Sequence, residues 1–133
     1  MNTFPLTVVT PDGVLYDGEA QSLLVRTQEG DVQILAGHTD MVAALVTGRA
    51  VLKLADGVRH AAVSGGFLTV EGGRVSAVCI TVEFAEAIDV ARAKAAKESA
   101  ERMLRDAKDN ASLDRAKAKL ARALTRLQVA DAL

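Results

Sequence analysis

Four basic residues near the C-terminus recur at spacings of four, three and four residues. On a helix of 3.6 residues per turn, this spacing places them along one face, where they form a continuous basic ridge. Arginine and lysine side chains carry several N–H donors, which suit an acidic protein surface or phosphate oxygens. The same pattern also fits a solvated helix flank that has no ligand. The basic ridge consists of Arg115, Lys119, Arg122 and Arg126.

The residues that usually carry out catalysis are few and scattered. His38 and His60 lie 22 residues apart without a motif around either, and no pair of carboxylates is isolated in an apolar segment. His38 and Asp40 share one predicted turn, but two ligands without a further cluster are too few for a metal site. Cys79 lies in an apolar run and is expected to be a small buried side chain. We therefore predict neither an enzyme nor a metal-binding protein.

The sequence changes character around Glu83–Ala93. All ten glycines, both prolines and all four aromatic residues lie at or before Phe84. The 49 residues that follow contain no glycine or proline, and 15 of them are alanine. Glycine and proline mark turns, whereas alanine favours helices. We therefore predict an α+β protein in which residues 1–84 form an antiparallel β-sandwich and residues 85–133 form a two-helix hairpin.

Short apolar runs separated by turn signals fill the first part. The predicted strands cover residues 4–10, 14–17, 20–27, 32–35 and 41–46. Breaks are predicted at Asp17-Gly18 and at Thr47-Gly48. Asp56-Gly57 and Gly72-Gly73 each separate two β-type runs, which is the pattern of a hairpin turn. Turns that recur every 8–12 residues favour a compact antiparallel sandwich or barrel.

Two helices are predicted after the boundary, with Asp89 as N-cap of the first and with turn and capping residues at 109–112 between them. Apolar residues recur every three or four positions in both, and such narrow stripes favour a close antiparallel pair. The stripes contain Ala93, Ala96, Ala100, Met103 and Ala107, and then Leu113, Ala116, Leu120, Ala123, Leu127 and Ala130. Burial of apolar area contributes about 25 cal/mol per Å², and these small side chains bury little of it. The isolated hairpin should therefore be only marginally stable. We expect it to dock on something, and in more than one way.

Charge and composition limit the partners. The formal net charge of −1 argues against a dedicated nucleic-acid-binding protein. A single cysteine excludes an internal disulfide and fits a reducing compartment. The chain shows no signal peptide and no apolar run of membrane-spanning length. We therefore expect synthesis in the cytoplasm and association with a membrane only through other proteins.

Three stretches together resemble a known family. They are GDVQILAGHTDMVAAL at 30–45, VSGGFLTVEGGRV at 63–75 and IDVARA at 88–93. In this order and at this chain length, the sequence resembles the epsilon subunit of bacterial F-type ATP synthases over essentially its whole length. It departs from the family pattern at Gln33, where glycine is usual, and at Ala36 and Asp40, where proline is found.

The resemblance implies a non-catalytic subunit of the rotor's central stalk, which couples ion translocation to ATP synthesis. Its sandwich would have about ten strands and bind the gamma subunit. Its hairpin would be mobile, either folded on the sandwich or extended along gamma into the alpha/beta catalytic head, where it inhibits ATP hydrolysis. The complex would place it at the cytoplasmic face of the cell membrane as a peripheral protein.

The resemblance also assigns partner contacts. Two loops would sit on the membrane-embedded c-ring, and the basic ridge, including Arg115 and Lys119, would meet acidic groups of the catalytic head. The loop residues are Glu29, Gly30, Asp31 and Val32, and Gly37, His38, Thr39 and Asp40.

Some bacterial members bind ATP as a regulatory ligand, and the resemblance carries this site onto the present sequence. No cofactor is required. Asp89 would accept from the base or ribose, or would only cap its helix, and Glu83 would accept from the adenine amino group. Ser99 stands where some ATP-binding relatives carry another arginine. The implied ATP site comprises Glu83, Ile88, Asp89, Arg92, Ala93, Arg122 and Arg126.

Two other functions remain open at this point. One is a stand-alone ATP-sensing module, which would bind nucleotide but no gamma subunit. The other is an unrelated β-sandwich adaptor with a helical tail, which would bind neither.

Overall fold

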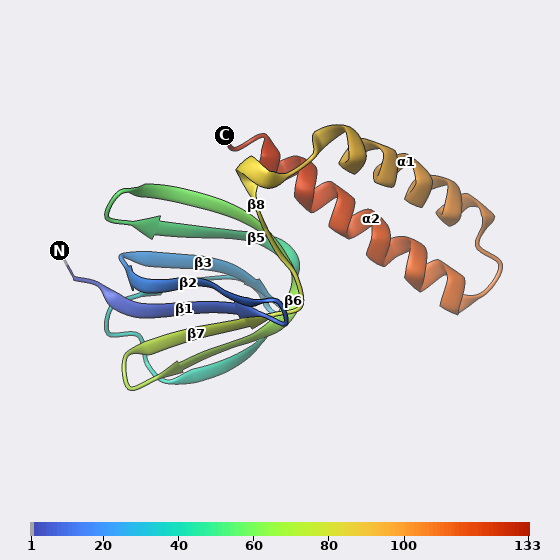
Figure 1. Ribbon diagram of the computed structural model, residues 1–133. Coiled ribbons are helices and arrows are strands. Elements are labelled where there is room, and N and C mark those ends of the chain that lie inside the picture. Colours follow the sequence, from blue (N-terminus) through green and yellow to red (C-terminus); the bar gives the residue numbers. More distant parts are fainter. Residues whose placement is uncertain (1) are drawn as a thin grey trace.

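The computed structural model describes residues 2–133, and it has a β-sandwich with a helical hairpin against one side (Figure 1). The predicted α+β class is therefore confirmed. The strands are β1 (Phe4–Thr10), β2 (Gly13–Ala20), β3 (Ser22–Thr27), β4 (Gly30–Leu35), β5 (Met41–Leu54), β6 (Gly57–Glu71), β7 (Arg74–Cys79) and β8 (Val82–Phe84). A 3-10 turn, η1 (Ala85–Ala87), leads to the helices α1 (Val90–Asp106) and α2 (Asn110–Ala130).

The two layers of the sandwich share their longest strands. Strands follow the order β2-β1-β7-β6-β5-β3-β4, and β8 pairs with the first part of β6. The second part of β6 pairs instead with β7, so the strand bends between its two partners. The bend lies at Gly65 and Gly66, which both have positive φ, and a Cβ at Gly66 would lie 2.1 Å from the Val78 carbonyl oxygen. Because β5 and β6 serve both layers, eight strands build the sandwich for which about ten were expected.

Two predicted breaks are wrong. β2 runs through Asp17-Gly18, and β5 runs through Thr47-Gly48. Both glycines allow close packing within the sheet rather than a turn. A Cβ at Gly18 would lie 2.9 Å from the Tyr16 hydroxyl, and one at Gly48 would lie 2.6 Å from the Cβ of Arg26 on β3.

Both predicted hairpins form, one of them with its turn shifted by one residue. β6 and β7 pair antiparallel around Gly72-Gly73, whereas the turn between β5 and β6 is Ala55-Asp56, because Gly57 already pairs with Leu54. The core between the layers consists of the inward-facing residues of alternating strand positions. Its largest fully buried members in the sandwich are Leu6, Leu23, Ile34, Leu68 and Val70.

Side-chain caps set the helix starts. The Asp89 carboxylate accepts from the Arg92 backbone N–H at 3.0 Å, as predicted. At the start of α2, Asp109 accepts from the Ser112 N–H at 2.7 Å, and the Ser112 hydroxyl accepts from the Asp109 N–H, which completes a capping box. The Ser112 backbone N–H and the Ser112 hydroxyl both donate to the Asp109 carboxylate, and these two hydrogen bonds lower the pKa of Asp109.

Alanines form the contact between the helices. Ala93, Ala100, Ala116 and Ala123 are at most 2% exposed, as the predicted stripes require. Met103 was expected on the same stripe but is 37% exposed. The seam of small side chains draws the helices together and leaves no room for its longer side chain.

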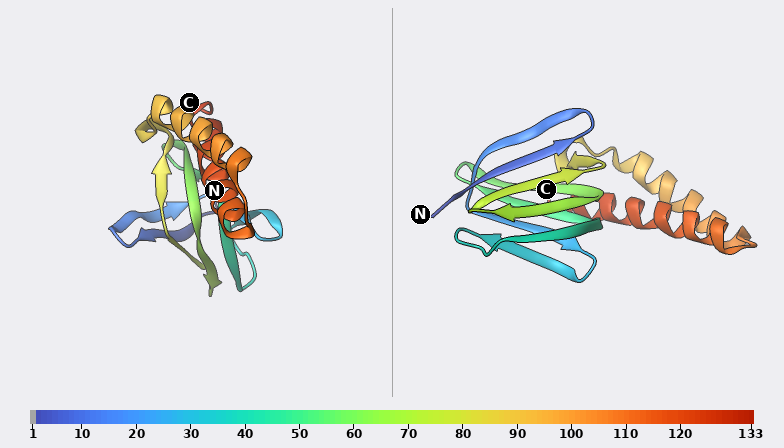
Figure 2. Two further views of the ribbon diagram at one scale, coloured as in Figure 1. Left: turned by 90° about the vertical axis from the view of Figure 1, so that its right-hand side faces the viewer. Right: turned by 90° about the horizontal axis from the view of Figure 1, so that it is seen from below.

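The hairpin meets the sandwich through α2, which contacts β5 and β6, while α1 packs on α2 (Figures 1 and 2). A small apolar cluster joins the parts and contains Ala62, Ala85, Ile88 and Val129. None of the helices in the described chain combines the length and apolar character needed to cross a membrane.

Arg59 on β6 fastens the connection between the two parts. Its guanidinium lies 3.6 Å from the centre of the Phe84 ring, and its Nη2 donates to Glu86 Oε1 at 3.1 Å. The pKa of Glu86 is lowered by a hydrogen bond from the backbone of Glu86 itself and by the one from Arg59. The chain therefore stays attached to the sandwich as far as η1.

The burial of Cys79 predicts an unreactive thiol. The side chain is 3% exposed, and burial raises its pKa to about 11, so the reactive thiolate is scarce at pH 8. We expect a colourimetric thiol reagent to label the native protein at least about a hundredfold more slowly than the unfolded protein. Cys79→Ala combined with Val78→Cys moves the thiol to a 50% exposed position and should react at once. Equal labelling rates for the native wild-type protein and the double variant would contradict the burial of Cys79.

Candidate functional site

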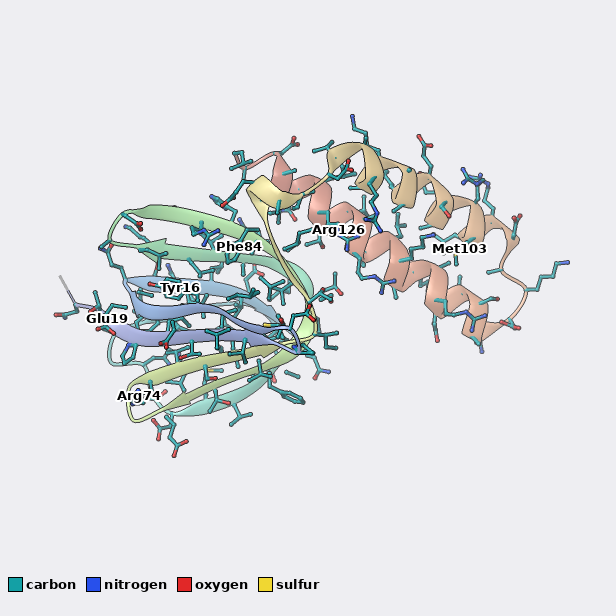
Figure 3. All side chains as sticks on the ribbon, in the orientation of Figure 1. Tyr16, Glu19, Arg74, Phe84, Met103 and Arg126 are labelled. Carbon is teal, nitrogen blue, oxygen red and sulfur yellow. The ribbon has the colours of Figure 1, made fainter. Side chains whose placement is uncertain are left out.

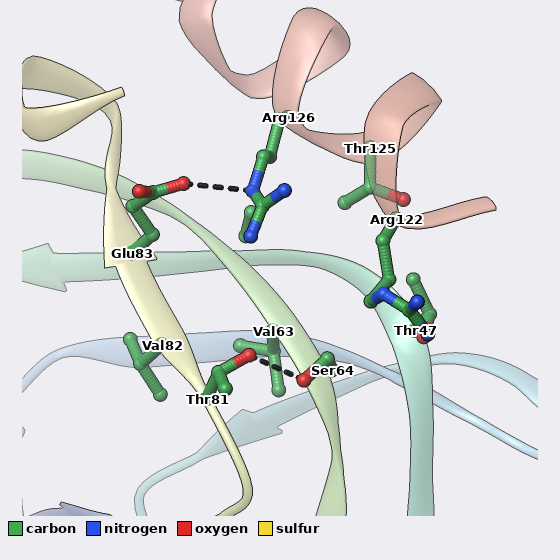
Figure 4. Close-up of a pocket in the computed structure, with 10 residues that line it drawn as sticks. Thr47, Val63, Ser64, Thr81, Val82, Glu83, Arg122, Thr125 and Arg126 are labelled. Atoms are coloured by element: carbon green, nitrogen blue, oxygen red, sulfur yellow. Dashed lines mark hydrogen bonds and ion pairs between the residues drawn. The ribbon is translucent and has the colours of Figure 1, made fainter. Parts of the chain in front are cut away.

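Two adjoining cavities lie where α2 faces the edge of the sandwich. The larger one has a volume of about 240 Å³ and is lined by Thr47, Ala62, Val63, Ser64, Thr81, Val82, Glu83, Arg122, Thr125 and Arg126 (Figure 4). The smaller one, of about 190 Å³, is lined by Glu83, Ala87, Asp89, Arg92, Ala93 and Arg126. Glu83 and Arg126 line both and separate the two spaces.

The boundary between the cavities is an ion pair across the two parts of the molecule. Arg126 Nε on α2 donates to Glu83 Oε1 on β8 at 2.9 Å. Both side chains are over one third exposed, so the pair contributes at most about 1 kcal/mol. Its larger effect is on position, because it fixes the charged ends of both residues between the cavities.

The smaller cavity combines two carboxylates with two guanidinium groups. Asp89 is the N-cap of α1 and Arg92 lies in its first turn, and the Asp89 Oδ1 atom accepts from the Arg92 N–H. Ala93 is 2% exposed, and its short side chain lets a neighbouring group approach the helix closely. The carboxylates can accept from an amine or hydroxyl, and the arginines can donate to phosphate oxygens.

The larger cavity is lined by hydroxyl groups from several elements. Thr47 lies on β5, Ser64 on β6, Thr81 just before β8 and Thr125 on α2. The Ser64 and Thr81 hydroxyls hydrogen-bond to each other. Figure 4 shows Arg122 and Arg126 reaching from α2 toward these groups.

The residues of the implied ATP site divide into three groups. Five of them line the smaller cavity: Glu83, Asp89, Arg92, Ala93 and Arg126. Arg122 lies in the larger cavity instead. Ile88 lines neither and packs in the apolar cluster with Ala62, Ala85 and Val129, where it helps dock the hairpin. Arg92 lies near the start of α1 and Arg126 near the end of α2, so the predicted antiparallel pairing brings them to the same end of the hairpin.

The hydroxyl residues of the larger cavity were not predicted from the sequence. Thr125 was detectable, because it stands three residues after Arg122 and one before Arg126 on a predicted helix. Thr47, Ser64 and Thr81 carry no local signal, because only the pairing of distant strands brings them together.

The basic ridge does not face open solvent along its whole length. Arg122 and Arg126 line the cavities, and Lys119 Nζ donates to Ser99 Oγ on α1 at 2.9 Å. Arg115 is exposed and has no ion-pair partner within residues 2–133. Only Arg122 and Arg126 of the ridge therefore lie beside the sandwich, whereas Lys119 contacts α1.

The two predicted partner loops are close to one another. In the first, Glu29 and Asp31 are exposed and Gly30 and Val32 half-buried; in the second, Gly37, Thr39 and Asp40 are exposed and His38 half-buried. Glu29 and Val32 line a hollow together with Met41 and Val42, the residues that directly follow the second loop.

Hydrogen bonds and ion pairs hold both loops. Asp31 pairs with Arg26 at 3.4 Å and with Arg49 at 3.9 Å. Asp40 Oδ1 accepts from the Gly72 N–H at 3.0 Å, which joins the second loop to the β6–β7 turn. Figure 3 shows Arg74, just after that turn, at the end of the sandwich away from the hairpin. Within residues 2–133 no three His, Cys, Asp or Glu side chains group as metal ligands.

An apolar face covers the outside of β5, β6 and β7. Phe67 and Val78 are cross-strand neighbours and are 61% and 50% exposed. Val42 and Ile80 flank them with 74% and 64% exposure. Clustered side chains of this size are typical of a surface that binds another protein. We define the apolar face as Val42, Phe67, Val78 and Ile80.

Two family models together match nearly the entire chain. The ATP synthase Delta/Epsilon chain beta-sandwich domain matches residues 3–85, and the Delta/Epsilon chain long alpha-helix domain matches residues 86–131. The chain belongs to the ATP synthase delta/epsilon family. The family resemblance of the sequence is thereby confirmed.

Individual relatives agree with the family models. The chain is 42% identical over 132 residues to the ATP synthase epsilon chain of Staphylococcus haemolyticus and 43% identical to that of Staphylococcus aureus, with 98% of each chain covered. Among solved structures, it is similar to a chain of the Euglena gracilis mitochondrial ATP synthase, with TM-score 0.85, 25% identity and coverage of 96% of this chain and 81% of that one. A chain of the Tetrahymena thermophila mitochondrial ATP synthase shares the fold, with TM-score 0.69, 14% identity and 95% coverage of both.

Membership in the delta/epsilon family decides between the functions left open. The chain has the role of an ATP synthase epsilon chain, a non-catalytic subunit of the complex. An unrelated adaptor and a stand-alone sensor do not account for a match to both family domains.

Proposed function

We propose that this subunit lies in the central stalk of the rotor at the cytoplasmic face of the membrane. There it contacts the gamma subunit and the c-ring and couples ion translocation to ATP synthesis. The observation that carries the proposal is the match of both parts of the chain to the delta/epsilon family. The exposed loop residues Glu29, Asp31, Thr39 and Asp40 are available to polar groups of the c-ring.

The apolar face is the proposed gamma-binding surface. It presents four large apolar side chains, three on strands of the sheet and Ile80 directly after β7, with exposed fractions between 50% and 74%. A partner that covers them removes this apolar area from water, which is the dominant favourable term in association. The proposed division at residues 84 and 85 further implies that the sandwich binds gamma without the hairpin.

Replacing Phe67 by Asp should weaken capture of the chain by the cognate gamma subunit by about tenfold or more, because a charge would enter the centre of the interface. Val58→Asp is the matched control for Phe67→Asp, since Val58 is 51% exposed but lies outside the apolar face.

A chain truncated after Ala87 should still unfold cooperatively and bind gamma. Undiminished capture of Phe67→Asp, or loss of binding on truncation, would refute the assignment.

The hairpin is the proposed mobile arm. Its docking on the sandwich rests on a small apolar cluster and one partly exposed ion pair, Glu83–Arg126. A docked and an extended state are therefore separated by only a few kcal/mol. Extension takes Arg122 and Arg126 away from the sandwich. The whole basic ridge can then meet acidic groups of the alpha/beta catalytic head and inhibit ATP hydrolysis.

We expect Arg115→Gln with Lys119→Gln to raise ATP hydrolysis by the reassembled, inhibited complex about threefold, since two exposed ion pairs contribute on the order of 0.7 kcal/mol. Both residues lie outside the two cavities, so nucleotide binding to the subunit should not change. Lys53→Gln with Arg74→Gln removes the same charge from the sandwich and serves as the control. Equal hydrolysis by both double variants would contradict a role of the ridge.

ATP is the proposed regulatory ligand of the smaller cavity, and it stabilises the docked hairpin. Glu83 and Asp89 offer acceptors to the base and ribose, and Arg92 and Arg126 offer donors to the phosphates. The cavity walls come from both parts of the chain, so a ligand bound there favours the arrangement in which they meet.

Calorimetric titration of the isolated subunit with ATP should give saturable heat, and ATP should raise its unfolding temperature. Arg92→Ala and Arg126→Ala should each weaken binding by about tenfold, because each removes a charge-assisted hydrogen bond. Arg126→Ala also removes the ion pair to Glu83, whereas Arg92→Ala does not, so the two variants separate ligand contact from docking. Arg102→Ala on the exposed side of α1 is the control. No heat at millimolar ATP, or binding that survives both substitutions, would reject this site.

A further inference from the structure

The turn between β3 and β4 is built around a buried hydroxyl group. Within residues 2–133, Thr27 is the one buried residue whose side chain carries an oxygen or nitrogen, and it is 5% exposed. Its Oγ1 donates to the Gly30 carbonyl oxygen at 2.8 Å and accepts from the Glu29 N–H at 3.2 Å. The hydroxyl therefore fixes the backbone on both sides of Glu29.

A third hydrogen bond ties the same turn to β5. The Gln28 N–H donates to the Ala44 carbonyl oxygen at 3.3 Å. Thr27 and Gly30 are paired residues of β3 and β4, so only Gln28 and Glu29 lie in the turn itself. A turn held in this way has little freedom left to lose when a partner binds, and its side chains are presented in one arrangement.

The carboxylates of the two partner loops differ in what they contact. Asp31 is paired with Arg26 and Arg49, and Asp40 accepts from a backbone N–H of the β6–β7 turn. Glu29 is exposed and belongs to no ion pair within residues 2–133. A partner's cation would have to compete with two arginines at Asp31, whereas nothing in the described chain competes for Glu29.

The hollow beside Glu29 is mainly apolar. It has a volume of about 290 Å³, and Val32, Met41 and Val42 contribute its largest apolar side chains. Glu29 is the only charged residue among those that line it. Lysine and arginine combine a long apolar stem with a cationic end, so the stem can lie in such a hollow while the charge meets a carboxylate at its edge.

We propose that Thr27 is a positioning residue, which holds Glu29 beside the hollow so that the two together bind a lysine or arginine side chain of the c-ring. This inference rests on the proposed contact with the c-ring. It assigns that contact to Glu29 rather than to Asp31 or Asp40, and it makes the hollow the site where the partner's side chain enters.

The complex of this chain with gamma is tested for capture of the detergent-solubilised c-ring at several salt concentrations. Glu29→Gln should weaken capture about tenfold at low salt, because it removes a charge-assisted hydrogen bond. It should also reduce the salt dependence of capture, since added salt screens the attraction between exposed charges. Glu98→Gln removes the same charge from an exposed position on α1 and should behave as the wild type does.

Thr27→Val keeps the shape of the side chain and removes the hydroxyl, so it should weaken capture of the c-ring about threefold. Thr27→Ser retains the hydroxyl and should restore capture. Because Thr27 acts through Glu29, Thr27→Val combined with Glu29→Gln should bind no more weakly than Glu29→Gln alone. Additive losses in the double variant would overturn the positioning role. Should Thr27→Val fail to fold, Thr27→Ala with Thr27→Ser makes the same comparison.

The outcomes separate this inference from the proposed function. Failure of the wild-type complex to capture the c-ring would refute the proposed contact and this inference with it. Capture that ignores Glu29→Gln would overturn the Glu29 site and leave the c-ring contact standing. Binding of gamma to the chain alone should be unchanged by Glu29→Gln, and its loss would place gamma rather than the c-ring in the hollow.

Discussion

The position of the hairpin depends on one line of contact between α2 and the edge of the sandwich. Ala62, Ala85, Ile88 and Val129 form its apolar part, and the Glu83–Arg126 ion pair forms its polar part. The helices pack on each other through alanines, so they bury little area of their own. The hairpin therefore needs the sandwich to hold its place, although its caps and composition already favour helix.

Both cavities exist because of this contact. Each has one wall from the strands or the connector and one wall from a helix. A ligand that bridges the walls and the docked arrangement stabilise each other to the same extent, because linkage is reciprocal. The same geometry places Arg122 and Arg126 beside the sandwich, where they line the cavities. Under the proposed function, docking of the hairpin, binding of a ligand in the cavities and release of Arg122 and Arg126 from the sandwich are therefore linked.

The sandwich is built on a different principle. Its core is continuous, and β5 and β6 each belong to both layers, so neither layer can shift without the other. The bend at Gly65-Gly66 makes this sharing possible, since a side chain at Gly66 would collide with the backbone of β7. Arg59 extends the rigid unit through Phe84 and Glu86. A stiff docking module joined to a weakly held arm is well matched to a subunit of a rotary complex.

The sequence by itself determined the features that depend on neighbours in the chain. Alanine-rich, glycine-free sequence specified the helices, Asp89 and Asp109 specified where they begin, and Asp56-Gly57 and Gly72-Gly73 specified hairpins, because these signals act within about four residues. The lengths and directions of the two helices also place Arg92 and Arg126 at the same end of the hairpin.

Only the tertiary structure decided the rest. Gly18 and Gly48 resemble turn glycines, yet they serve the approach of Tyr16 and Arg26. Ile88 matches a nucleotide motif, yet it packs in the docking cluster. The hydroxyls of Thr47, Ser64 and Thr81 meet through the pairing of distant strands. Such contacts are set by register and by how two parts dock, and no local periodicity records them.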